Sequence, residues 1–152
     1  MTITPDDYCN SLTDYSRFKT REVIVGTIGI GGNNPVRIQS MTTTDTMDTK
    51  ETVEQSIRMI EAGSELVRIT APSKREAENL KNIKKEIRNH GYNTPLVADI
   101  HSTPNAALIA AEIVEKVRIN PGNYVDKKKF NIIEYNDESY ARELDKIKDR
   151  FI

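Results

Sequence analysis

The chain has a single cysteine, Cys9, among its 152 residues. One cysteine cannot form an internal disulfide, and it cannot by itself hold a zinc ion or an iron–sulfur cluster. We therefore expect no metal ligands within this chain, and we interpret Cys9 as an unpaired thiol in a reducing cytosol.

Long apolar runs and an excess of charge of one sign are also missing. No run approaches the ~18 apolar residues of a membrane span, and the mean hydropathy is −0.58. The N-terminus carries Asp6 and Asp7 and shows no secretory or organellar signal. The net charge is −1 without a basic block, whereas nucleic-acid binding needs a cationic surface. These absences predict a cytoplasmic protein that binds neither membranes nor nucleic acid.

The sequence does contain an alternation of short apolar runs with helical segments. Four runs are typical of strands, at 36–41, 65–70, 96–100 and 116–119. Three segments with helical spacing separate these runs, and each begins at a capping residue, Asp48, Ser73 or Thr103. Gly63 and Gly91 stand where the first two helices should end. This order predicts an α/β fold with a parallel sheet, consisting of about four β/α units of a TIM barrel.

The flanking segments complete the predicted architecture. Residues 21–30 are rich in β-branched side chains and precede a Gly/Asn turn at 31–35, which predicts a β-hairpin at the bottom of the barrel. Residues 130–135 are expected to form a short strand, and a C-terminal helix is expected to begin near Asn136 or Asp137. A closed barrel needs ~250 residues. We therefore divide the chain into a lead-in at 1–20, the first half of a barrel at 21–123, and a loop with a helix at 124–152.

Basic residues interrupt or follow three of the predicted strands. Arg68 and Arg118 lie within otherwise apolar runs, and His101 directly follows the third strand. Because the carboxyl ends of parallel strands meet at one edge of a sheet, we expect these residues to form one pocket for an anionic, phosphorylated ligand. An unpaired guanidinium facing the barrel would cost several kcal/mol. Ligand contact is favoured, and the alternative is a structural ion pair with a neighbouring Asp or Glu.

Polar neighbours extend this predicted site. Asp99 shares strand parity with His101, so their side chains should point to the same side and one could orient the other. The alternative for His101 is a helix cap or a solvent-facing side chain. Gln39 and Thr42 offer neutral donors around the end of the first strand, and the turn from Asn120 offers backbone N–H groups to an oxyanion. The predicted binding residues are therefore Arg68, His101, Arg118, Asn120, Gln39, Thr42 and Asp99.

A series of short motifs within residues 19–123 carries a family resemblance. The motifs are Val25-Gly26 with Ile30-Gly31-Gly32, Gln39-Ser40-Met41-Thr42 with Thr44-Asp45-Thr46 and Asp48, Ala62-Gly63 with Leu66-Val67-Arg68, Leu96-Val97-Ala98-Asp99-Ile100-His101, and Val117-Arg118-Ile119-Asn120-Pro121-Gly122-Asn123. Each motif is modest alone. In this order, however, they resemble the N-terminal barrel of the 4-hydroxy-3-methylbut-2-enyl diphosphate synthases, iron–sulfur enzymes of the non-mevalonate isoprenoid pathway.

The resemblance implies an oxidoreductase that opens the ring of 2-C-methyl-D-erythritol 2,4-cyclodiphosphate and expels water. It implies a [4Fe–4S] cluster, held by three Cys and one Glu of a separate C-terminal domain, and two electrons from flavodoxin or ferredoxin. In the implied homodimer, the barrel of one chain binds the diphosphate and faces the iron–sulfur cluster of the other. Arg68, His101 and Arg118 match the diphosphate ligands or their near neighbours.

The chain also departs from the family pattern. The ligands of the iron–sulfur cluster and the later barrel strands are missing, and Ser102-Thr103 stands where the family usually has Phe. Residues 124–152 resemble the larger variety of the enzyme, which carries an extra domain. We therefore expect an N-terminal fragment that binds substrate and is inactive alone. The alternatives are a phosphate-binding barrel of the pterin-synthase type and an α/β interaction module without a ligand.

Overall fold

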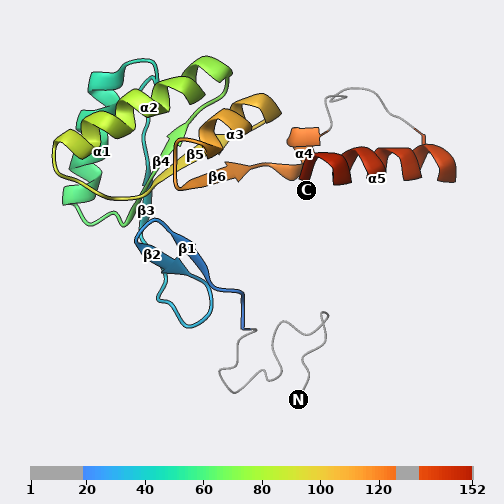
Figure 1. Ribbon diagram of the computed structural model, residues 1–152, viewed down its shortest axis with the longest axis horizontal. Helices are drawn as coiled ribbons and strands as arrows, with labels where there is room; N and C mark the ends of the chain where they lie inside the picture. The colour runs from blue at the N-terminus through green and yellow to red at the C-terminus, as the bar shows by residue number, and fades with distance from the viewer. Residues whose placement is uncertain (1–18, 126–133, 152) are drawn as a thin grey trace.

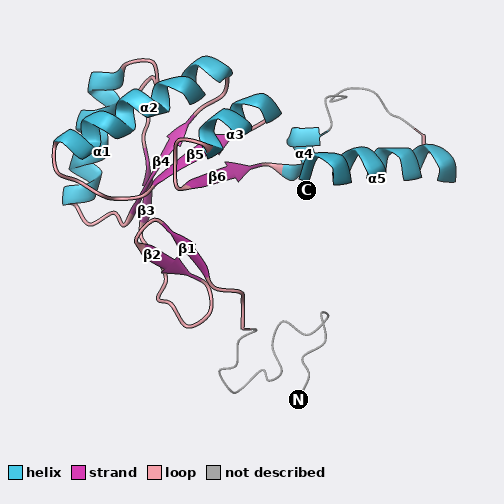
Figure 2. Cartoon of the chain, viewed as in Figure 1, coloured by secondary structure: helices cyan, strands magenta, loops and turns pink. Residues whose placement is uncertain are grey.

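The computed structural model describes residues 19–125 and 134–151 of the chain. The elements are β1 (Val23–Val25), β2 (Ile28–Ile30), β3 (Gln39–Met41), α1 (Thr49–Glu61), β4 (Leu66–Thr70), α2 (Lys74–Asn89), β5 (Leu96–Ile100), α3 (Pro104–Ala111), β6 (Lys116–Ile119), α4 (Pro121–Val125) and α5 (Asp137–Phe151). Figure 2 shows this alternation of strands and helices. The predicted α/β class, the hairpin before the β/α units and the C-terminal helix are confirmed.

Strands β3 to β6 form one parallel sheet in chain order, β3-β4-β5-β6. In this register Met41 pairs with Arg68, Thr70 with Asp99, and Asp99 with Arg118. Helices α1, α2 and α3 connect successive strands and lie together on one side of the sheet (Figure 1). Parallel strands in chain order, connected by helices that cover one face of the sheet, are the arrangement of a partial TIM barrel.

The two faces of the sheet differ in chemistry. The face toward the helices forms the main core, whose fully buried strand residues are Val67, Ile69, Leu96, Ala98 and Ile100. Helix α2 contributes Leu80, Ile83 and Ile87 to the same core. Successive side chains of a strand point to opposite faces, so the intervening residues Arg68, Asp99 and Arg118 lie on the other face. Polar side chains of the strands are thereby gathered away from the helices.

The β1–β2 hairpin covers the amino end of that second face, at the bottom of the sheet, where it was expected. Val25 packs against Leu66 and Val97 near the starts of β4 and β5. Its turn, however, was misplaced by the prediction. The two-residue turn is Gly26-Thr27 rather than 31–35, because the chain after residue 35 pairs in parallel with β4 and does not return along β2. Gly26 has φ +59°, and a Cβ there would lie 2.9 Å from Pro95 Cγ.

The helix starts follow the local signals in the sequence. Asp48 caps α1 by accepting a hydrogen bond from the Glu51 N–H, and Ser73 forms a capping box with Glu76 at the start of α2. The predicted extent of the third helix was wrong at its end, since α3 stops at Ala111. The chain turns there so that Val114 can enter the core before β6 begins.

The first strand of the sheet is shorter than predicted. It begins at Gln39 rather than at Val36, which is 87% exposed. The preceding residues run beyond the start of β4, and Arg37 forms an ion pair with Glu65 at 2.8 Å instead of continuing the strand. The strand expected at 130–135 lies mostly outside the described residues, as does Cys9. Glu134 and Tyr135, which are described, are not in a strand.

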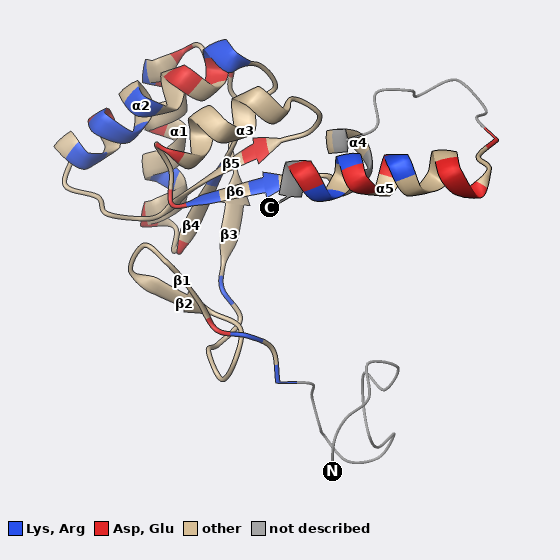
Figure 3. Ribbon diagram, turned by 45° about the vertical axis from the view of Figure 1, so that its right-hand side comes forward, with Lys and Arg blue, Asp and Glu red and all other residues tan. Residues whose placement is uncertain are grey.

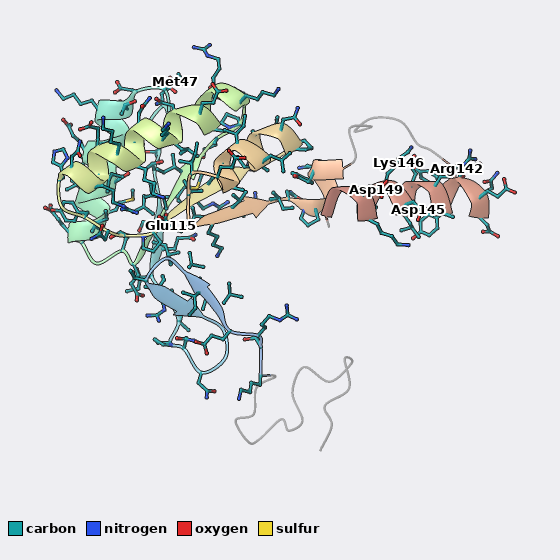
Figure 4. The ribbon with its side chains drawn as sticks, viewed as in Figure 1. Met47, Glu115, Arg142, Asp145, Lys146 and Asp149 are labelled. Carbon is teal, nitrogen blue, oxygen red and sulfur yellow. The ribbon has the colours of Figure 1, made fainter. Side chains whose placement is uncertain are left out.

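Helix α5 begins at Asp137, as the sequence predicted; it contacts α4 and lies away from the sheet and from α1, α2 and α3 in Figure 1. Its apolar stripe of Tyr140, Leu144 and Ile147 is exposed. Figure 4 labels four of its charged residues, Arg142, Asp145, Lys146 and Asp149, all far from the sheet. In the part of the chain that the structure describes, no helix is long and apolar enough to cross a membrane.

Candidate functional site

Two arginines from flanking strands converge on one buried carboxylate. Arg68 of β4 donates from Nη2 to Asp99 Oδ2 at 2.7 Å, and Arg118 of β6 donates from Nη1 to Asp99 Oδ1 at 3.0 Å. The Asp99 side chain is 1% exposed, whereas those of Arg68 and Arg118 are 25% and 36% exposed. In the ribbon of Figure 3, the end of β5 is acidic and the neighbouring strand β6 is basic. The carboxylate therefore holds two guanidinium groups whose outer parts reach solvent.

His101 joins this group from the loop after β5. Its Nδ1 lies 3.9 Å from Asp99 Oδ2, and its side chain is 55% exposed. The expectation that Asp99 and His101 point to the same side is confirmed. The distance is too long for a hydrogen bond, so the two interact through charge when the imidazole is protonated. We call Arg68, Asp99, His101 and Arg118 the Asp99 cluster, and the predicted convergence of its three basic residues is confirmed.

The Asp99 cluster carries an excess of positive charge. Two guanidiniums and one carboxylate give a formal charge of +1, and a protonated His101 would add a further positive charge. The Nε atom of Arg68 is buried and has no hydrogen-bond partner among the described residues. The ion pair considered as the alternative for Arg68 is present. The buried Nε is out of reach of an anion, but both guanidinium side chains are partly exposed and can offer further donors. A small anion with several oxygens would complement such a group.

Thr42 and Asn120 border the Asp99 cluster at the ends of β3 and β6. Thr42 is buried, and its N–H donates to the Arg68 carbonyl at 2.9 Å. The turn predicted after Asn120 is instead the first turn of α4. The Asn120 carbonyl accepts the N–H groups of Asn123 and Tyr124 at 3.1 and 2.9 Å. Those two N–H groups are therefore not free for an oxyanion, which corrects the prediction.

Gln39 occupies a different position from the one predicted. It opens β3 in register with Leu66 and does not follow the strand. Because Met41 pairs with Arg68, Gln39 lies on the face of Arg68 but two residues nearer the hairpin. There it lines a cavity of about 480 Å³ together with Ile30 and Lys116. The structure thus brings four of the seven predicted residues into one cluster, with Thr42 and Asn120 beside it and Gln39 further away.

Sequence reasoning missed the contacts that fix the loop between β3 and α1, residues 42–48. Gln55 of α1 accepts the N–H groups of Thr43 and Thr44 at 3.0 and 3.2 Å. Asn79 of α2 donates from Nδ2 to the Thr46 carbonyl at 2.7 Å. One signal for Asn79 was available, since asparagine has a low helix propensity and stands here amid an apolar helical face.

A second charged group lies at the opposite end of the sheet. Glu115 accepts the Leu96 N–H at 2.8 Å and forms ion pairs with Lys84 at 2.9 Å and Arg88 at 3.2 Å. Burial raises the pKa of Glu115, but hydrogen bonds from Leu96 and Lys84 lower it more, so the pKa lies below its ordinary value of 4.5. Figure 4 shows Glu115 near the hairpin and Met47 of the 42–48 loop at the other end. This group joins α2 to the sheet.

The described residues do not fit an iron–sulfur cluster. Such clusters are held mainly by cysteine thiolates, and residues 19–125 and 134–151 include no cysteine. Within these ranges there is also no group of three or more His, Cys, Asp or Glu residues that could hold a metal ion. The chemistry that these residues offer is binding of an anion.

Comparisons with known proteins agree on one family. The family model described as the GcpE TIM-barrel domain matches residues 20–142. Proteins named 4-hydroxy-3-methylbut-2-en-1-yl diphosphate synthase (flavodoxin) are similar to nearly the whole chain. The one from Akkermansia muciniphila is 55% identical over 144 residues, 95% of this chain and 25% of the relative.

Two further relatives carry the same name. The protein from Phocaeicola vulgatus is 58% identical over 142 residues, 93% of this chain and 23% of the relative. The protein from Chlorobaculum tepidum is 50% identical over 145 residues, 95% of this chain and 19% of the relative. The chain therefore spans a quarter or less of the length of these curated relatives.

Proposed function

Because this chain belongs to the GcpE TIM-barrel family, we propose that it is the N-terminal substrate-binding part of a 4-hydroxy-3-methylbut-2-enyl diphosphate synthase. The whole enzyme would be an oxidoreductase of the non-mevalonate isoprenoid pathway. It would convert 2-C-methyl-D-erythritol 2,4-cyclodiphosphate to 4-hydroxy-3-methylbut-2-enyl diphosphate. Residues 21–123 would form the first half of its barrel, and this part alone would bind substrate without turning it over.

The observation that carries the proposal is the Asp99 cluster at the carboxyl edge of the parallel sheet. Active sites of TIM barrels lie at this edge, and a diphosphate complements partly exposed guanidiniums because their N–H donors match pairs of phosphate oxygens. Arg68 and Arg118 would donate to the diphosphate, and protonated His101 would add positive charge. Asp99 would orient both arginines, because it already bonds to each of them.

The remaining predicted residues would have subsidiary roles. Thr42 and Asn120 border the Asp99 cluster and would contact the less charged part of the substrate. Gln39, nearer the hairpin, would contact a ligand only if that ligand reached down the inner face of the sheet.

The cofactor and partners are proposed for the whole enzyme rather than for this chain. A [4Fe–4S] cluster would be held by three Cys and one Glu of a separate C-terminal domain, and it would pass electrons from the donor protein to the substrate. The names of the relatives specify flavodoxin, which supports flavodoxin as the electron donor. We further propose a cytoplasmic homodimer in which the barrel of one chain faces the iron–sulfur cluster of the other.

Isothermal titration of this chain tests the proposal directly. We expect saturable binding of the cyclodiphosphate by the native chain, and loss of that binding in Arg68→Gln and Arg118→Gln. The matched control is Arg75→Gln, because Arg75 is an exposed arginine of α2 outside the Asp99 cluster. A pterin pyrophosphate separates the rival barrel type. Binding of the pterin ligand without binding of the cyclodiphosphate would contradict the proposal, and binding of neither would favour an interaction module.

A further inference from the structure

The 42–48 loop is bonded at two points to the strand that carries Arg68. The Thr42 N–H donates to the Arg68 carbonyl at 2.9 Å, and the Thr46 hydroxyl donates to the Thr70 carbonyl at 2.6 Å. Thr70 is the strand partner of Asp99. The loop is therefore bonded to β4 at Arg68 itself and at Thr70, the register partner of Asp99.

The first half of this loop is held from α1. Gln55 accepts two loop N–H groups and donates from Nε2 to the Thr43 hydroxyl at 3.0 Å. The Thr52 hydroxyl donates to the Asp45 carbonyl at 3.0 Å. Because α1 continues directly from the loop, these contacts fix the loop to its own helix and not to the rest of the barrel.

The second half of the loop is held from α2 by Asn79. This side chain is 9% exposed, and its Nδ2 donates to the Thr46 carbonyl at 2.7 Å and to the Thr49 hydroxyl at 2.9 Å. Its Oδ1 accepts from Asn82 Nδ2 at 2.9 Å. All hydrogen-bonding groups of the Asn79 amide are thus used. Loss of the amide would leave the Thr46 carbonyl without this donor in a buried environment.

We propose that Asn79 is a positioning residue for the anion site, acting on the Asp99 cluster through the 42–48 loop. Asn79 fixes Thr46, the Thr46 hydroxyl fixes the Thr70 carbonyl, and Thr70 pairs with Asp99. The expected effect of the loop on ligand binding rests on the proposed function. A binding group must be held within a fraction of an ångström of its working position, so a loosened loop should weaken binding although Asn79 touches no ligand.

The test compares two substitutions at Asn79 in the 152-residue chain. Asn79→Ala removes the amide, and Asn79→Asp keeps its shape but places an oxygen against the Thr46 carbonyl. We expect the loop N–H groups at 43–48 to exchange with solvent about tenfold faster in both variants, while exchange in the core of α2 stays unchanged. We expect the dissociation constant for pyrophosphate to rise about tenfold. A purely space-filling role would leave Asn79→Asp like the native chain.

The matched control removes an asparagine of α2 that has no contact with Asn79. Asn82 itself donates to Asn79, so the control is placed instead at Asn89, as Asn89→Ala. Asn89 lies on the same helix, is exposed, and donates to Glu86 rather than to Asn79 or the loop, so its loss should change neither quantity. If Asn79→Ala fails to fold, Thr46→Val removes only the hydroxyl that donates to Thr70 and should weaken pyrophosphate binding to the same degree.

Each result decides between the two proposals. Loop exchange in both Asn79 variants equal to that of Asn89→Ala overturns the anchoring role. Unchanged pyrophosphate affinity together with faster loop exchange overturns the positioning role. A native chain that takes up no pyrophosphate refutes the proposed function and with it the positioning role, while the exchange rates still decide whether Asn79 anchors the loop.

Discussion

Asp99 and Arg68 lie on neighbouring strands, and their side chains meet at 2.7 Å on the face of the sheet turned away from the helices. The acid is almost fully buried, whereas a quarter of the Arg68 side chain is exposed. Because of this difference in burial, the buried carboxylate holds one side of the Arg68 guanidinium, and the exposed part of the Arg68 side chain faces solvent. Arg118 repeats the arrangement from the other side of Asp99.

Replacing the central acid should destabilise the fold. Asp99→Asn removes the charge that both guanidiniums approach and turns an amide N–H₂ toward one of them. We expect the free energy of unfolding in urea to fall by about 1–3 kcal/mol. Asp149→Asn, on the exposed surface of α5, is the control and should change the stability little. Equal stability of Asp99→Asn and the native chain would show that Asp99 does not hold the cluster together.

Arg68→Lys should preserve the charge but reduce anion binding. A lysine has one ammonium in place of a planar fork and cannot bond to Asp99 and an anion in the same geometry. We expect the dissociation constant for pyrophosphate to rise about tenfold, which corresponds to about 1.4 kcal/mol. Arg75→Lys on α2 controls for the substitution itself and should bind like the native chain. Native affinity in Arg68→Lys would mean that only the charge matters.

The role assigned to His101 predicts a dependence of anion binding on pH. Histidine changes its charge between about pH 5 and 8, and only the protonated ring attracts an anion. Affinity for pyrophosphate should therefore fall as the pH rises, more steeply in the native chain than in His101→Gln. Since pyrophosphate titrates in the same range, the difference between the two profiles is the quantity to measure. Parallel profiles from about pH 5.5 to 8.5 would remove His101 from a charged role.

Local signals predicted much of the fold. The Ser73 capping box and the glycine at 91 were readable because each depends on residues within a few positions of one another. The turn of the hairpin could not be predicted from local signals. Gly26-Thr27 and 31–35 are both turn signals, and the choice between them depends on Val25 packing against Leu66, some forty residues away.

The sequence predicted which residues belong to the site, but not that Asp99 lies at its centre. Strand ends placed Arg68, His101 and Arg118 at one edge, and strand parity placed Asp99 beside His101. That Asp99 bonds to both arginines depends on the register between strands, with a separation of 31 residues for Arg68 and 19 for Arg118. Asn79 was missed because its partner Thr46 lies 33 residues away. No local pattern reports such pairs.

Glu115 should make stability depend on pH in the acidic range. Its pKa in the folded chain is lowered, so its contribution is fully present above its ordinary pKa of 4.5. The contribution is lost as the pH falls through the lower pKa of the folded state. Glu115→Gln should lower the free energy of unfolding at neutral pH by about 1–3 kcal/mol and flatten its decline below pH 4.5. Glu112→Gln, at an exposed acid nearby, should leave the profile unchanged.

The exposed stripe of α5 predicts self-association of the chain. Tyr140, Leu144 and Ile147 form an apolar face on this helix, and β3 and β6 are edge strands of the sheet, which readily template pairing. Sedimentation should show dimers or larger species whose fraction grows with concentration. Leu144→Asp should reduce that fraction, while Ala141→Asp adds the same charge outside the stripe and should not. A monomer at high concentration would refute the prediction.

The hairpin and the Glu115 group secure the amino end of the sheet with residues that take no part in the Asp99 cluster. The residues that stabilise the amino end of the sheet therefore differ from the residues of the same strands that form the proposed binding surface. Related proteins could differ in the side chains at the carboxyl edge, and with them in the ligand, while the packing at the amino end of the sheet stays the same. Within β4 to β6, a change of ligand would therefore leave the contacts at the amino end intact, whereas a change at Asp99 itself would also affect the stability of the fold.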